Sequence, residues 1–256
     1  INQMTCPAKI QKHGLYCVSL QAKRTYMRKI TVIIAAILMF CGCSSAEKRA
    51  QILFETNMGN IRMELYNETP IHRDNMLRLV KSGFYAGILF HRVIADFMIQ
   101  FGDPDSRTAE PGVFLGEAQD TTVSDLPAEI LYPELFHKRG ALCAAREGND
   151  VNPERKSSTS QFYIAFGRTY TADELQGRRD LFEQRNGYRQ EVTPELETYY
   201  IENPGIPHLD SEYTVFGQVL EGIKVVEAIQ AVETDENDRP LADVRILKAS
   251  VVKDLK

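Results

Sequence analysis

One short stretch of this 256-residue chain combines residue types that could form a ligand-binding site. Residues 90–103, with the sequence FHRVIADFMIQFGD, alternate with the period of two that is typical of a β-strand. Phe97, Met98 and Gln100 follow Arg92 by five, six and eight positions, so a bend or bulge must bring the four side chains to one surface. We interpret the stretch as a site with one fixed cation, one amide and an apolar floor.

The same residues also have a structural interpretation. An arginine beside apolar strand residues is most often the partner of an ion pair, and Phe and Met at this spacing most often belong to a core. The spacing alone therefore leaves a ligand site and a structural role both open.

Four segments together resemble one family, the cyclophilins, which are cyclosporin-binding peptidyl-prolyl isomerases. Residues 90–103 are similar to the signature strand pair of that family over a dozen positions, from the Phe-His-Arg opening to the Gly-Asp close. Residues 140–146 (GALCAAR), 160–164 (SQFYI) and 207–217 (PHLDSEYTVFG) resemble three further family segments, in the same order along the chain. The four segments sample most of residues 51–252.

The resemblance implies a binding site for proline-containing polypeptides. Transferred residue by residue, it makes Arg92 the catalytic cation and gives hydrogen-bonding roles to Gln100 and Gln161. It places the backbone around Ala145 and Arg146 against the residue that precedes proline. The implied proline pocket consists of Phe97, Met98, Tyr163 and Leu209, with Tyr213 on its rim.

No cofactor and no metal are expected for this chemistry. Rotation about a prolyl bond is opposed by a barrier of about 18–20 kcal/mol, but it makes and breaks no bond to carbon. His72, His91, His137 and His208 lack the spacing of metal ligands, and the acidic turn at residues 103–105 lacks the glycine and glutamate of a calcium loop. We expect His91 to be structural and to point away from Arg92.

Some positions depart from the family pattern. His208 stands where cyclosporin-sensitive members have tryptophan, so we expect weak cyclosporin binding without loss of isomerase activity. Tyr213 replaces a common histidine, Arg146 replaces an asparagine that acts mainly through its backbone, and Phe101 replaces a glycine.

Two classes of function remain as alternatives to each other. The first is a peptidyl-prolyl cis-trans isomerase that assists the folding of exported proteins. The second is a non-catalytic module, such as a chaperone, that binds proline-containing segments on the same fold, since a fold does not guarantee an activity. The intact set of Arg92, Phe97, Met98 and Gln100 favours the enzyme, and it also argues against a purely structural lipoprotein.

The N-terminal residues have the pattern of a bacterial lipoprotein signal. Residues 27–42 combine a basic start with the apolar run 30–40, which at about 11 residues is too short to span a bilayer. A buried helix is the alternative, but no amphipathic period is present. The run leads to a small residue directly before Cys43, the expected site of lipidation. We expect residues 1–26 to be an upstream artefact of gene calling and residues 43–50 to be a tether.

Processing at Cys43 would leave a strongly acidic protein. The first 42 residues contain six of the 30 basic residues and no acid, so 24 bases would face 35 acids, a net charge of −11. Such a chain should repel nucleic acid and anionic lipids. We therefore expect a monomer held by its lipid in the cell envelope, at the periplasmic face of the outer membrane. Cys143 is expected to fill the core rather than form a disulfide.

The remaining sequence indicates a single domain at residues 51–256. The resemblance implies a mainly β fold, a closed eight-stranded antiparallel barrel capped by two helices. The sequence pattern agrees with strands at 51–56 and 60–65 around a turn at Gly59, a helix from the N-cap Thr69 to Gly83, a helix at 222–231 and a final strand at 244–252.

Residues 167–207 depart from the compact family core. A capping box at Thr171–Glu174 and the sequence Thr193-Pro194 each predict the start of a helix. We interpret the segment as a helical insertion. Its dense charge favours a solvated excursion, with a lid that binds a partner or substrate as the alternative.

Overall fold

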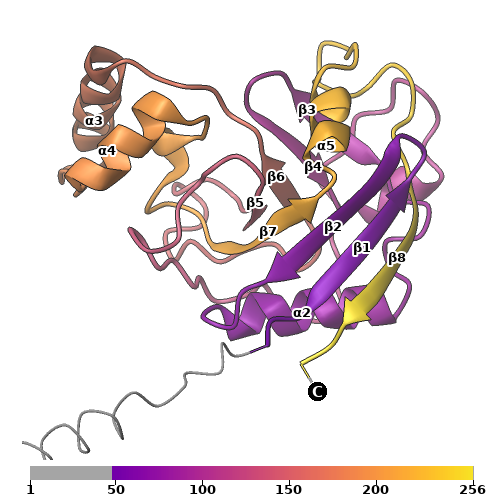
Figure 1. Cartoon of the computed structure of the whole chain (residues 1–256). Coiled ribbons are helices and arrows are strands. Elements are labelled where there is room, and N and C mark those ends of the chain that lie inside the picture. The colour runs from indigo at the N-terminus through magenta and orange to yellow at the C-terminus, as the bar shows by residue number, and fades with distance from the viewer. Residues whose placement is uncertain (1–47, 256) are drawn as a thin grey trace, which may run out of the picture. The chain divides into compact units, whose positions relative to one another are not determined.

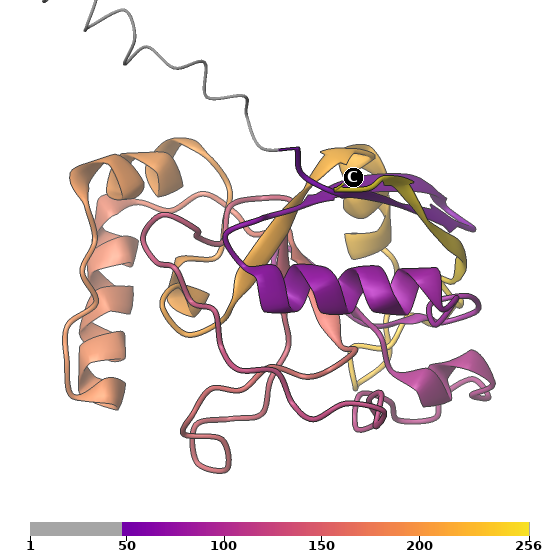
Figure 2. The ribbon, with the colours of Figure 1, turned by 90° about the horizontal axis from the view of Figure 1, so that it is seen from below.

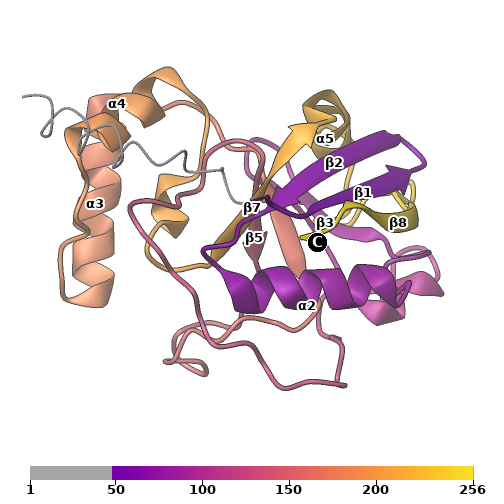
Figure 3. The same ribbon diagram turned by 60° about the horizontal axis from the view of Figure 1, so that its bottom comes forward.

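Eight strands form one antiparallel sheet in the computed structural model, which describes residues 48–255 (Figure 1). The order of the strands in space is β3-β4-β6-β5-β7-β2-β1-β8. Each strand is short, with four to eight residues, and the sheet curls strongly around its core (Figure 3). The strands are β1 Gln51–Thr56, β2 Gly59–Leu65, β3 Phe90–Ile94, β4 Met98–Phe101, β5 Ala141–Ala144, β6 Phe162–Ala165, β7 Val215–Glu221 and β8 Ile246–Lys253.

The closed barrel expected from the sequence is not supported, because the two edge strands do not pair along their length. Contact between them is confined to their first residues: a bridge between Leu89 and Arg245 is flanked by backbone hydrogen bonds from Phe90 to Val244 and from Ile246 to Ile88. The outer edge of β3 is instead covered by the loop before β8, whose Asp238 carbonyl accepts a hydrogen bond from the Val93 amide at 2.8 Å. This loop occupies the position that a fully paired β8 would need, so the sheet is a curled half-barrel.

Four α-helices lie among the described residues, two more than expected for the capped barrel. Helix α2, Pro70–Lys81, runs along the sheet beside β7 and β8, and helix α5, Ile223–Gln230, packs near β2, β3 and β4 (Figures 1 and 2). Helices α3, Ala172–Asn186, and α4, Pro194–Glu202, stand to one side of the sheet. Two 3₁₀ turns, η1 Pro104–Arg107 and η2 Pro207–Leu209, complete the regular structure. No helix in residues 48–255 has the length and apolar character needed to cross a membrane.

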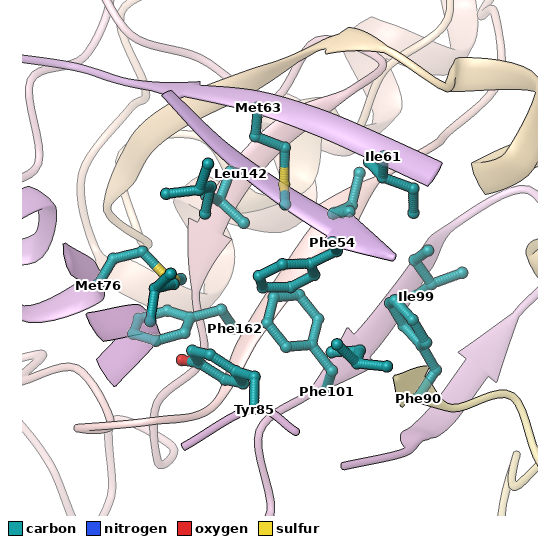
Figure 4. Packing of buried hydrophobic residues seen from close by; sticks show 14 of the residues in the cluster. Phe54, Ile61, Met63, Met76, Tyr85, Phe90, Ile99, Phe101, Leu142 and Phe162 are labelled. Atoms are coloured by element: carbon teal, nitrogen blue, oxygen red, sulfur yellow. The ribbon is translucent and has the colours of Figure 1, made fainter. Parts of the chain in front are cut away.

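The interior of the sheet is filled by aromatic and aliphatic side chains (Figure 4). Every second residue of β1 is buried, as expected for a strand with one face on the core, and this places Ile52 and Phe54 inside. Phe101 packs its ring edge-on against Phe54 at 5.3 Å and against Tyr85 at 5.6 Å between ring centroids. Such edge-to-face pairs add stability beyond the burial of their area. Cys143 is fully buried, as predicted.

Helix α2 begins at the predicted position but is capped differently. Thr69 is the N-cap residue, yet its hydroxyl is buried without a hydrogen-bond partner. The carboxylate of Glu129 caps the helix instead, accepting hydrogen bonds from the amides of Ile71 and His72 at 3.0 Å each. Partial burial opposes ionisation of Glu129, but hydrogen bonds from His72 and these amides outweigh it and lower the pKa of Glu129.

The insertion is helical, as predicted. The capping box at α3 is complete, because Thr171 and Glu174 each accept a hydrogen bond from the other's backbone amide, and Thr193 caps α4. Gly187 ends α3 in the left-handed conformation with φ of 75°, where glycine is least strained. The insertion has its own small apolar cluster, which is formed by Tyr170, Leu175, Leu196 and Tyr200.

Candidate active site

The stretch from residue 90 to 103 folds as a hairpin rather than as one bent strand. Strands β3 and β4 are joined by a turn in which Asp96 has a φ of 55°, a conformation that aspartate tolerates. The register pairs Arg92 directly with Gln100, so the two side chains are cross-strand neighbours. The register of this pairing shifts between Phe90 and Arg92, where His91 turns inward.

His91 is buried and Arg92 is exposed, which agrees with the predicted structural role of the histidine. Neither ring nitrogen of His91 has a hydrogen-bond partner among the described residues. Burial lowers the pKa of His91 to about 4, and the nearby Arg92 and Arg239 act in the same direction against Asp103. His91 is therefore neutral at physiological pH.

The structure brings nine of the ten predicted substrate-site residues to one pocket. The pocket has a volume of about 190 Å³ and lies between β3, β4, β6 and the η2 turn. Gln161, the tenth residue, lies directly behind it against Gln100. The pocket is lined by Arg92, Phe97, Met98, Gln100, Ala145, Arg146, Tyr163, Leu209 and Tyr213.

The floor of the pocket is apolar and rigid. Met98 and Tyr163 are only 2% and 4% exposed, because β4 and β6 hold them in adjacent paired strands. Leu209 and Phe97 are partly buried beside them and complete the walls. Tyr213 meets the ring of Tyr163 edge-on, at 6.1 Å between centroids. A compact apolar ring such as that of proline matches this lining.

Arg92 supplies a cation at the mouth of the pocket. Its Nε donates a hydrogen bond to the Asp238 carboxylate at 3.2 Å, and 44% of its side chain is exposed. Neither terminal nitrogen of Arg92 is hydrogen-bonded within the described part of the chain, so both remain available to a ligand. Sequence reasoning missed Asp238, which lies 146 positions away in an ordinary polar turn and carries no motif.

The two glutamines are oriented by one hydrogen-bond chain. Gln161 donates through Nε2 to the carbonyls of Gly116 and Ala118 at 2.8 and 2.7 Å, so its oxygen faces Gln100. Gln100 must then present its own amide nitrogen, which donates to that oxygen at 2.9 Å. The carbonyl oxygen of Gln100 is left free to accept a hydrogen bond from a ligand.

Arg146 offers mainly its backbone to the pocket, because its side chain is engaged elsewhere. Its guanidinium is 4% exposed, pairs with Glu212 at 3.0 Å and lies 4.5 Å from the centre of the Tyr213 ring. The backbone of Ala145 is already used, since its amide donates to Gln161 and its carbonyl accepts from Ser158. Of the two predicted backbone positions, only Arg146 therefore keeps a free amide and carbonyl for a peptide.

A second hollow of about 660 Å³ adjoins this pocket, and the two share Gln100, Ala145 and Arg146 along their common border. Its acidic side chains are Glu117, Asp125, Glu147 and Glu154. Of its bases, Arg146 pairs with Glu212 and Lys156 pairs with Glu154. The remaining carboxylates make this part of the groove acidic.

Covalent catalysis finds no support in the pocket. The nearest cysteine, Cys143, is fully buried, and burial raises its pKa well above the ordinary value, so it is an unreactive thiol. The residues that do face the pocket can hold an apolar ring, donate from a fixed cation and accept at one amide oxygen. These are the functions needed to bind a planar amide and stabilise a twisted one.

The fold and site define a class of known proteins. A family model described as "Cyclophilin type peptidyl-prolyl cis-trans isomerase/CLD" matches residues 51–251. Two crystal structures of a cyclophilin-type isomerase from Cryptosporidium parvum, one determined in the presence of the dipeptide Ala-Pro, superpose with TM-scores of 0.54 and 0.55. Each is 23% identical in sequence, and the alignments cover 81% and 80% of this chain and 99% of the other.

Curated relatives carry the same activity in their names. The peptidyl-prolyl cis-trans isomerase cypE of Dictyostelium discoideum is 31% identical over 201 residues, which cover 78% of this chain and 96% of that protein. A Streptococcus pyogenes serotype M6 protein, named for both phosphatase and isomerase functions, is 35% identical over 201 residues, which are 77% of this chain and 37% of that longer protein. The chain belongs to the family of cyclophilin-type peptidyl-prolyl cis-trans isomerases.

Proposed function

We propose that this isomerase catalyses rotation about Xaa-Pro bonds in exported polypeptides of a bacterial cell envelope. The observation that carries the catalytic part is the free guanidinium fork of Arg92 at the mouth of an apolar pocket. The pocket holds the proline ring, and the free backbone groups of Arg146 pair with the residue before it. The proposal for substrates is in keeping with the relative from Cryptosporidium parvum that was crystallised in the presence of Ala-Pro.

The mechanism follows from what changes during rotation. In the planar amide the nitrogen lone pair is delocalised into the carbonyl, whereas in the twisted state it is localised on a pyramidal nitrogen. A donor aimed at that lone pair binds the twisted state more tightly than the planar one, which lowers the barrier. Arg92 is suited to this role because it is always protonated and donates from a planar, rigid fork.

The size of the required effect is within reach of these groups. Raising a rate from about 0.01 per second to about 1,000 per second needs roughly 7 kcal/mol. One preorganised donor supplies about 3–4 kcal/mol of transition-state stabilisation. Fixing the proline ring on the floor of Met98 and Tyr163 while the carbonyl side turns supplies the rest through orientation and exclusion of water.

The proposed location rests on the sequence of the N-terminal region. Cys43 and the signal peptide at residues 27–42 lie outside the described residues. We infer lipidation at Cys43 from the small residue Gly42 directly before it and the short apolar run upstream. This anchor would hold the acidic remainder of the chain, as a monomer, at the periplasmic face of the outer membrane. Loss of the full chain from the membrane fraction in Cys43→Ser, but not in Cys41→Ser, is the expected result, and retention of Cys43→Ser would exclude this anchor.

Activity is tested by the cis-to-trans rate of a short Xaa-Pro peptide with the full chain in mild detergent. We expect Arg92→Ala to reduce kcat about 100-fold or more with little change in KM, because Arg92 acts in the twisted state. Arg62→Ala is the matched control, since Arg62 is another exposed arginine paired with a carboxylate, on β2 outside the pocket. If the wild type binds the peptide without accelerating its isomerisation, the non-catalytic binding module replaces the enzyme.

A further inference from the structure

The insertion contacts the proline pocket through helix α3. Arg178 on α3 donates from Nη1 to Nδ1 of His208 at 3.2 Å. The imidazole of His208 stacks on the ring of Phe97, with centroids 5.4 Å apart and planes 18° apart. Since a guanidinium is only a donor, Nδ1 must accept, and the proton of the imidazole is on Nε2. We call this chain of contacts from Arg178 through His208 to Phe97 the first relay. It connects the insertion to a wall of the pocket.

A second relay starts from helix α4 and ends at the pocket floor. The hydroxyl of Tyr200 donates to Oδ2 of Asp210 at 2.6 Å, and Nδ1 of His137 donates to Oδ1 of the same carboxylate at 2.8 Å. The other ring nitrogen of His137 lies 2.9 Å from the hydroxyl of Tyr163. Burial raises the pKa of Tyr163 well above its ordinary value, so this hydroxyl stays protonated. All four side chains are no more than 4% exposed.

Both relays pass through the short segment that forms the far side of the pocket. His208 and Asp210 flank Leu209, whose side chain lines the pocket. Gln190, also from the insertion, donates to the Asp210 carbonyl at 2.7 Å. The η2 turn has only three residues and lies outside the sheet. Backbone bridges of Gly205 to Lys138 and Arg168 hold the chain before the turn, and these side-chain contacts hold the turn itself and its far end. By contrast, a segment in the sheet would be held by backbone pairing.

We propose that the insertion at residues 167–207 is a support of the proline pocket, with Arg178 and Tyr200 as positioning residues for the walls formed by Phe97, Leu209 and Tyr163. This proposal rests on the proposed function, because it assigns these residues a part in binding the substrate's proline. It replaces the expectation that the insertion is a solvated charged excursion. Neither Arg178 nor Tyr200 reaches the substrate, so neither is a catalytic residue.

The relays predict a specific kinetic signature. The pocket walls contact the proline ring in both the planar and the twisted state, so loosening them weakens both states equally. We expect Arg178→Leu and Tyr200→Phe each to raise KM by about 3- to 10-fold and to change kcat by less than about twofold. This is the opposite of the signature expected for Arg92→Ala, which lowers kcat. The two kinds of variant can therefore be told apart in one assay.

Matched control variants come from the neighbouring positions. Arg179 lies next to Arg178 on α3 but bonds only to Gln176 and Glu197, within the insertion. Tyr199 precedes Tyr200 on α4 and packs against Phe136, and its hydroxyl has no hydrogen-bond partner among the described residues. Arg179→Leu and Tyr199→Phe make the same chemical changes on the same two helices and should leave KM unchanged.

A double-mutant cycle separates positioning from general stability. In a His208→Phe background the stacked ring is retained but the Arg178 hydrogen bond has no acceptor. Arg178→Leu should therefore raise KM in the wild type and have no further effect on His208→Phe. Thermal unfolding of each variant is measured in parallel, so that any loss of folded protein is known and corrected.

Each outcome of the test decides the proposal. A selective rise in KM for Arg178→Leu and Tyr200→Phe, absent from the controls and cancelled in the cycle, supports it. Equal KM values for all four single variants, whatever their melting temperatures, would overturn it and restore the solvated excursion. Should the wild type prove inactive, the same comparison is made with the dissociation constant of the Xaa-Pro peptide, so that failure of the enzyme and failure of the relays remain distinct.

Discussion

The two sides of the proline pocket are held in place by different means. On one side, β4 and β6 carry Met98 and Tyr163 in fully paired strands backed by the aromatic core (Figure 4). On the other side, the η2 turn presents Leu209 on a segment held by side-chain hydrogen bonds to the insertion. We therefore expect a loss of packing on the sheet side to destabilise the whole domain, and a similar loss on the turn side to cost much less.

The largest effect expected from this comparison is on stability. Phe101→Ala on β4 removes a fully buried ring that packs against Phe54, Tyr85 and Phe90, and should cost about 3–5 kcal/mol of unfolding free energy. Leu209→Ala on the turn side removes a partly buried side chain and should cost about 1 kcal/mol or less while raising KM. Urea unfolding and peptide kinetics on both variants measure this, and equal losses of stability would contradict the comparison.

Two histidines, one on each side of the pocket, should make the free energy of unfolding depend on pH. Burial, more than the neighbouring arginines, lowers the pKa of His91 and of His208 to about 4, below the ordinary value of 6.5. As the pH falls below 6.5, the unfolded chain binds protons at these sites while the folded protein does not, so stability present above pH 6.5 is lost down to about pH 4. Each histidine should account for about 1–2 kcal/mol between pH 6.5 and pH 5.

Single substitutions assign this pH dependence to the two sides. We expect His91→Phe and His208→Phe each to flatten the slope of unfolding free energy against pH in that window. Urea unfolding at pH 7, 6 and 5 provides the measurement. This range suits the histidines, because carboxylates with lowered pKa values affect stability mainly at lower pH. A slope that survives in the double variant would mean that other groups carry it.

Asp238 offers a smaller test, at the loop that covers the edge of β3. Its carboxylate accepts a hydrogen bond from Nε of Arg92 and leaves the two terminal nitrogens free for the substrate. Asp238→Gly should therefore lower kcat by about 3- to 10-fold, because Arg92 loses the exposed ion pair that orients it. Glycine suits the φ of 62° at this position, so the backbone should not be strained. Glu236→Gln, an exposed acid in the same turn, is the control for net charge. An unchanged kcat in Asp238→Gly would show that Arg92 needs no partner.

Sequence reasoning succeeded where structure depends on local pattern and failed where it depends on distant contacts. The pocket residues on β4 and β6 could be placed because strand alternation and a family resemblance fix them together. The helix caps Thr171 and Thr193 were predicted because a cap is a local arrangement. Thr69 was also predicted correctly as the N-cap residue of α2, but the side chain that accepts from the free helix amides is Glu129, which is distant in sequence and is brought there only by the fold.

The same limit explains the other differences. A half-barrel rather than a closed barrel results from a loop that pairs with β3 through Asp238, and no periodicity encodes where a loop will lie. The contacts of the insertion with the pocket were missed because Arg178 and Tyr200 lie among many charged residues, a composition that is equally typical of a solvated helix. Buried hydrogen-bond partners of this kind become visible only with coordinates.

The smallest expected effect concerns the groove beside the sheet side of the pocket. The two bases of the hollow next to Gln100 are paired with acids, and among the described residues no ion pair neutralises its carboxylates Glu117, Asp125 and Glu147. A proline peptide carrying lysine within a few residues of the proline should therefore show a kcat/KM about 2- to 5-fold higher than the same peptide with glutamate, since exposed charges contribute only about 0.5–1 kcal/mol. The difference should shrink in 0.5 M salt, because screening weakens exposed pairs. An equal rate for both peptides at low salt would mean that the substrate chain leaves the pocket on the turn side, along the insertion, and the two sides of the pocket would then differ in substrate contact as well as in stability.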